Sequence, residues 1–119
     1  MSVIGDMRQH GEHETGKFDG SISTLGLSIQ FELEPARKST NPNAPSHYVM
    51  AKGRGGRTVQ IGSAWLRTAI RGENEGAKFF SITLDDPSMP YPLNVAAFRR
   101  EQSAIWDITW RRRAVAPAA

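Results

Sequence analysis

The chain has 119 residues, of which 39% are hydrophobic and 23% are charged, and it contains no cysteine. This length is typical of one domain with its own hydrophobic core, and the lack of cysteine excludes disulfides, thiolate nucleophiles and cysteine-ligated zinc. The net charge of +3 is uneven, because residues 1–45 hold four basic and six acidic residues, whereas residues 46–119 hold eleven basic and six acidic ones.

The first predicted elements lie between Phe18 and Leu33. From Leu25 to Leu33 every second residue is apolar, which is typical of a half-buried strand. Upstream, Phe18 and Ile22 follow the opposite phase. A bulge or bend near Ser23 would reconcile the two phases.

A polar segment with three prolines separates these residues from the rest of the chain. Residues 34–46 contain no large apolar side chain, so we expect a solvated loop there, flexible over residues 35–46. The strands expected after this loop are residues 47–52, 59–70, 78–84, 91–98 and 104–110. The second of these changes its apolar phase at Gly62 and Ser63, which predicts a bulge.

The strand pattern predicts an all-β fold. No stretch of twelve or more residues keeps a helical stripe of apolar side chains. Six or seven short strands separated by turns indicate either a small antiparallel sandwich or a partly open barrel. We expect one domain over residues 1–119 with a loose tail at residues 113–119. Neither a signal peptide nor a membrane span is predicted, so we expect a cytoplasmic protein without membrane contact.

Two adjacent aspartates and three prolines stand in the stretch ITLDDPSMPYPLNV, residues 82–95. Neighbouring residues of a strand point to opposite faces, so Asp85 and Asp86 do not easily converge on one metal ion or one scissile bond. An aspartate before Pro87 is instead typical of a turn in which the carboxylate accepts backbone N–H groups. We therefore interpret Asp85, Asp86 and Pro87 as a structural turn.

Other patterns that carry chemistry are missing from the sequence. The segment HGEHE, residues 10–14, holds two histidines, but neighbouring glycines indicate a hairpin loop instead of the helix that an HExxH zinc site needs. There is no GxSxG nucleophile elbow and no GxxxxGK[ST] phosphate loop. We expect no catalytic residue, no metal site and no cofactor, and hence a protein that is not an enzyme.

Basic and aromatic residues in the second part of the chain are the remaining candidates for a site. Small β-barrels bind single-stranded nucleic acids with a basic groove and aromatic side chains on which bases stack. We expect Trp65 and Tyr48 to be the aromatics that matter most. The candidate nucleic-acid-binding residues are Lys52, Arg54, Arg57, Trp65, Arg67, Arg71, Arg111, Arg112 and Arg113.

A protein-binding function stays open beside this one. Trp65 lies between Ala64 and Leu66 and would fit a core as well as a surface, and arginines at a C-terminus can simply keep a small protein soluble. The chain would then act as an interaction module that inhibits or modulates another protein. It could also self-associate through an exposed sheet edge.

Several motifs resemble a known family. The most distinctive are GSAW at residues 62–65 and LDDPSMPYP at residues 84–92, and a closing ITWR adds to them. These motifs resemble the bacterial domain of unknown function 736 family, small proteins of plasmids and integrative conjugative elements. The chain departs from the usual pattern at Ser46-His47, in an insertion around GRGGRTV and in its final arginine run. The resemblance implies an accessory role on a mobile genetic element and assigns no activity. For the protein-binding alternative, it implies an inhibitor or modulator of a host or transfer-machinery protein.

Overall fold

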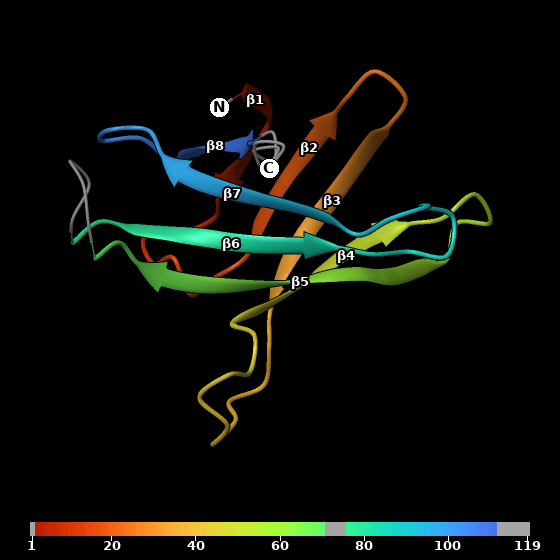
Figure 1. Cartoon of the computed structure of the whole chain (residues 1–119). Coiled ribbons are helices and arrows are strands. Elements are labelled where there is room, and N and C mark those ends of the chain that lie inside the picture. Colours follow the sequence, from red (N-terminus) through yellow and green to blue (C-terminus); the bar gives the residue numbers. More distant parts are fainter. Residues whose placement is uncertain (1, 71–75, 112–119) are drawn as a thin grey trace, which may run out of the picture.

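The computed structural model describes residues 2–70 and 76–111, and all of their regular secondary structure is β-strand (Figure 1). The strands are β1 (Ser2–Gln9), β2 (Phe18–Ser23), β3 (Ser28–Pro35), β4 (His47–Lys52), β5 (Thr58–Thr68), β6 (Lys78–Leu84), β7 (Leu93–Arg99) and β8 (Ile105–Trp110). Within these residues no helix is long and apolar enough to cross a membrane. The tail expected at residues 113–119 lies outside the described part of the chain.

The eight strands form one closed barrel in which each strand pairs antiparallel with the next along the chain. β1 closes the barrel by pairing with β8, from Ser2 opposite Trp110 to Arg8 opposite Ile105. The all-β prediction is confirmed, but the sheet is a closed barrel of eight strands instead of a sandwich or partly open barrel of six or seven. Because closure removes edge strands from the described sheet, the expected self-association could use only strand ends that extend beyond their neighbours.

The strand predicted over residues 25–33 is wrong at its start. β3 begins at Ser28, and the preceding residues form a hairpin turn in which the Thr24 N–H donates to the Leu27 carbonyl over 2.7 Å. Leu25 lies at this turn with its side chain fully exposed. The expected bulge or bend is therefore a hairpin turn. A bulge and a hairpin turn both change which alternate residues are apolar, so periodicity alone does not distinguish them.

β1 has no counterpart in the sequence prediction, because Gly5 interrupts it and Met7 and Gln9 are its only buried side chains. The strands predicted at residues 47–52 and 78–84 are confirmed, and those at residues 59–70, 91–98 and 104–110 are confirmed with shifted ends. Residues 36–46 lie between β3 and β4, and Pro35, which was expected in the loop, ends β3.

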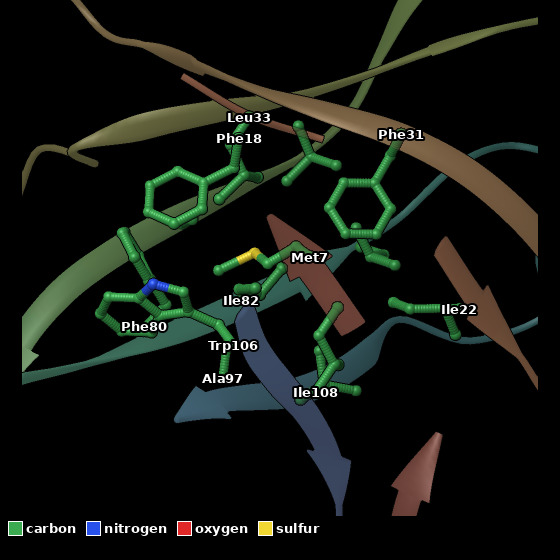
Figure 2. Close-up of a cluster of buried hydrophobic side chains, with 14 of the residues drawn as sticks. Met7, Phe18, Ile22, Phe31, Leu33, Phe80, Ile82, Ala97, Trp106 and Ile108 are labelled. Carbon is green, nitrogen blue, oxygen red and sulfur yellow. The ribbon is translucent and has the colours of Figure 1, made fainter. Parts of the chain in front are cut away.

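Apolar side chains from all eight strands fill the barrel interior (Figure 2). Phe18, Phe80 and Trp106 form an aromatic cluster, in which the Phe18 ring centroid lies 5.1 Å from that of Phe80 and 5.6 Å from that of Trp106. Both contacts are edge-to-face, an arrangement that aromatic quadrupoles favour. The interior of an eight-stranded barrel is just wide enough for such side chains, so a partner is expected to bind on the outer surface.

Gln9 and His47 are the buried polar residues of the described chain. The His47 Nε2–H donates to the Gly16 carbonyl over 2.8 Å, and the His47 Nδ1 lies 2.9 Å from the Ser46 Oγ. The Gln9 Oε1 accepts a bond of 3.1 Å from the Trp106 indole N–H. These bonds attach the turn between β1 and β2 to the core. Burial lowers the pKa of His47, so the environment favours its neutral imidazole.

Candidate nucleic-acid interface

The predicted basic residues fall into two groups in space. Lys52, Arg54 and Arg57 lie at the turn between β4 and β5, and Arg111 follows β8 at the same end of the barrel. Arg67 lies near the C-terminal end of β5, toward the opposite end, because successive strands run in opposite directions. The remaining candidates, Arg71, Arg112 and Arg113, lie outside the described residues. The structure therefore does not gather the predicted arginines into one patch.

A diagonal row of half-buried aromatic side chains crosses the outer face of β4 to β7. The alternating burial of these strands turns Tyr48, Trp65, Phe79 and Phe98 outward. Phe79 and Phe98 are cross-strand partners with stacked rings, whose centroids are 5.5 Å apart and whose planes differ by 19°. The register places Trp65 diagonal to Phe79 and Tyr48 diagonal to Trp65, at Cα separations of about 7–8 Å. Two of the four, Tyr48 and Trp65, are the aromatics expected from the sequence.

Small and polar side chains occupy the rest of this surface. Ser81 pairs with Ala96 beside the stacked phenylalanines, and in the next row Thr83 donates a hydrogen bond of 2.8 Å to the Asn94 side chain. Across β6 and β7 the surface thus has a pair of aromatic side chains, then a pair of small side chains and then a pair of polar ones. We name it the aromatic face; its residues are Tyr48, Ser63, Trp65, Arg67, Phe79, Ser81, Thr83, Asn94, Ala96 and Phe98.

Trp65 is held at the surface by the long loop between β3 and β4. Its indole N–H donates to the Asn43 carbonyl over 3.0 Å, and its side chain is half-buried. Trp65 is therefore not part of the core, unlike Trp106, which is buried in the barrel interior. The hydrogen bond fixes the orientation of the indole ring, which reduces the entropy that a stacking ligand would otherwise have to remove.

The aromatic face carries a cation and no carboxylate. Arg67 lies opposite Phe79 in the register, is exposed and takes part in none of the ion pairs between described residues. On the neighbouring strand β8, the Asp107 carboxylate lies opposite Phe98 in the register and accepts a bond of 2.8 Å from Arg100 in the β7–β8 turn, whose pKa it raises. On the other side, the first carboxylate is that of Glu34 on β3, opposite Tyr48. The electrostatics of the face therefore suit an anionic ligand better than a cationic one.

The LDDP stretch forms a turn directly after β6. The Asp85 N–H donates to the Ile61 carbonyl over 2.7 Å, and the Asp86 carboxylate accepts bonds from the Ser88 hydroxyl and, over 3.0 Å, from the Ser88 N–H. These two bonds, chiefly the one from the hydroxyl, lower the pKa of Asp86. Among the described residues no group of three histidine or acidic side chains is placed to hold a metal ion.

The motifs that resemble a bacterial family are matched by comparison with family models. A model described as a protein of unknown function (DUF736) matches residues 3–113. The chain belongs to the DUF736 family. No curated protein and no solved structure matches the chain. Because the DUF736 description assigns no activity, the function has to be inferred from the geometry of this barrel.

The GSAW motif of this DUF736 chain begins at a close approach of β5 to β6. β5 bulges at Ile61, one residue before the predicted position. A Cβ on Gly62 would lie 2.1 Å from the Thr83 carbonyl oxygen, so only glycine fits this crossing. Ala64 is fully buried inside the barrel, and Trp65 turns outward. The motif thus serves the fold, and through its tryptophan it also builds the aromatic face.

Phe79 and Phe98 are the residues of this face that the sequence prediction does not single out. In KFFSITL the buried phase is Phe80, Ile82 and Leu84, which leaves Phe79 on the solvent phase. An aromatic side chain at a solvent-facing position of an alternating strand is unusual, and this pattern in the sequence could have identified Phe79 as a candidate binding residue. Phe98 carries no comparable signal, because its predicted strand lacks clean alternation.

Proposed function

We propose that this protein binds single-stranded DNA or RNA, largely without sequence preference, on its aromatic face. The observation that carries the proposal is the diagonal row of four outward aromatics on adjacent strands. Stacking of a base on an aromatic side chain contributes about 1–3 kcal/mol and tolerates any base, because every base has a π-face. A row of this kind would accept about one base per ring.

The residues around the aromatics support the same ligand. Arg67 lies beside Phe79 with no ion-pair partner among described residues, and could contact a phosphate. The small side chains of Ser81 and Ala96 leave room for a ligand beside the stacked rings, and the Asn94 amide can form hydrogen bonds with base edges or sugars. In a duplex the base faces are covered by their neighbours, so the face is expected to favour single strands.

The biological role that we propose follows the family resemblance. A protein that protects or presents single strands during transfer would be a non-enzymatic accessory protein of a mobile genetic element. Such a role needs neither cofactor nor catalytic residue. The three basic residues at the turn between β4 and β5 would steer nucleic acid toward the protein at long range without contacting its phosphates in the complex.

The test is fluorescence polarisation with a labelled oligothymidylate of about twelve nucleotides at about 50 mM salt. Phe98→Ala should weaken binding at least about fivefold, which corresponds to the loss of one stacking contact. Tyr91→Ala is the matched control, because Tyr91 is exposed but lies in the loop between β6 and β7, off the aromatic face. Circular dichroism checks that both variants keep the barrel.

Two results would overturn the proposal. The first is no binding of the oligonucleotide by the wild-type protein at low salt. The second is an equal loss of affinity in Phe98→Ala and Tyr91→Ala, or a loss in neither, since stacking on the aromatic face must distinguish these two positions. A duplex of the same length should bind more weakly than the single strand.

A further inference from the structure

A groove of about 590 Å³ lies on the outer face of β1 to β4, outside the aromatic face. The register arranges its floor in two rows, Asp6–Ser21–Gln30 and Arg8–Asp19–Glu32. Its far wall is the end of β4 and the start of β5, where Lys52 pairs with Thr58. Three carboxylates oppose two cations in this groove, so its charge is opposite in sign to that of the aromatic face.

The groove contains strand backbone that no other strand covers. The ladder between β3 and β4 begins at Glu32 opposite Met50, so the residues Ser28–Phe31 pair with β2 and have no partner on β4. On β4, Ala51 and Lys52 pair only with β5. The β2–β3 hairpin and the end of β4 diverge beyond this ladder (Figure 1). We name the space between them the β3–β4 notch.

The β3–β4 notch offers two different environments to an inserted strand. Alternate side chains of such a strand would point inward and outward. The inward ones would meet Ile29, Ala51 and Val59, which are half-buried apolar residues packed against the core. The outward ones would meet Glu32, which takes part in no ion pair between described residues, whereas the Asp19 carboxylate is already bonded to His10.

We propose that the β3–β4 notch binds an extended segment of a partner protein in which apolar residues alternate with lysine or arginine. The unpaired backbone of β3 and β4 would supply the main-chain hydrogen bonds of an added strand. The apolar floor and the carboxylates would select the two kinds of side chain. This partner differs from the nucleic acid proposed above and uses a surface separate from the aromatic face, so neither proposal depends on the other.

The test uses a capped peptide of about seven residues in which valine alternates with lysine, a length that fits a typical strand. Hydrogen exchange of the whole chain, followed by nuclear magnetic resonance or mass spectrometry, maps the contact. We expect new protection at Ser28–Phe31 and at Ala51 and Lys52. A peptide with the same sequence but N-methylated on alternate amides should give no protection, because it cannot complete the ladder.

The charge requirement is tested with variants of one exposed residue. Glu32→Lys should weaken peptide binding on the order of tenfold, and Glu32→Gln should weaken it less. Protection that maps to the aromatic face, or binding that survives N-methylation, would overturn the proposal. Protection of the notch that grows with protein concentration in the absence of peptide would also overturn it, because a second copy of the chain would then be the occupant.

Discussion

Replacing Gly62 with alanine should remove several kcal/mol from the free energy of unfolding. A Cβ on Gly62 would lie 2.1 Å from the Thr83 carbonyl oxygen and 3.0 Å from the Leu84 Cα. Both atoms belong to the backbone of β6, so no side chain can rotate away and the strands must separate. Overpacking costs about 1–3 kcal/mol and each lost hydrogen bond about 1 kcal/mol. We expect a total loss of roughly 3–5 kcal/mol, a large part of the stability of a small domain.

Urea unfolding, followed by the fluorescence of the buried Trp106, measures this loss. With an m-value of about 1–3 kcal/mol per molar urea, the midpoint should fall by at least about 1 M. Gly26→Ala is the matched control, because a Cβ on Gly26 has no atom within 4 Å and its φ is not in the left-handed region. This variant should be neutral or stabilised by less than about 1 kcal/mol. Equal midpoints for the two variants would refute the close approach of β5 and β6 at Gly62.

Three further predictions concern charge, pH and the long loop. Arg67→Gln should reduce the slope of log affinity against log salt for oligothymidylate by about one. Arg54→Gln at the β4–β5 turn should leave this slope nearly unchanged. The reverse result would mean that the turn, and not Arg67, contacts the phosphate. Burial lowers the pKa of His47 in the folded state below the unfolded value of about 6.5, so its contribution to stability is complete above that pH and is lost as the pH falls toward the folded pKa. The free energy of unfolding obtained from urea titrations should therefore decrease on acidification by up to about 1.4 kcal/mol per pH unit, and His47→Gln should lack this component. Trp65→Phe should lower the free energy of unfolding by about 1 kcal/mol and speed amide hydrogen exchange in residues 36–46, because the hydrogen bond to the Asn43 carbonyl is lost. Unchanged exchange would mean that this bond does not order the loop.

Strand content could be predicted from the sequence because burial alternates cleanly along most strands. Phe80 and Ile82 are buried as their period-two spacing predicts. The hairpin at Leu25 could not be predicted, because a turn and a bulge shift the apolar phase in the same way. β1 could not be predicted either, since a strand with Gly5 at its centre buries too few apolar side chains to show a pattern. Closure of the barrel depends on the pairing of β1 with β8, a long-range contact that no local pattern encodes.

The candidate site was predictable only in part, because it depends on register. The sequence pointed to Trp65 and Arg67, which share an outward phase two residues apart on β5. Their neighbours Phe79 and Phe98 come from two other strands, and only the cross-strand pairing brings the four together. The same pairing separates Arg54 from Arg67, although both were candidates for one patch, because β5 extends from one end of the barrel toward the other.

The two halves of the barrel share a backbone feature, a close crossing of two strands at a glycine, although their outer surfaces differ. A Cβ on Gly5 would lie 2.1 Å from the Ser21 carbonyl oxygen, the same distance as between a Cβ on Gly62 and the Thr83 carbonyl oxygen. Each glycine follows a bulge, at Ile4 in β1 and at Ile61 in β5. The close crossings of β1 with β2 and of β5 with β6 are therefore equivalent in their packing. Their outward residues are not, since carboxylates line the first pair and aromatics the second. The packing of the crossings does not require this difference, so the outward positions can serve the two different ligands that we propose.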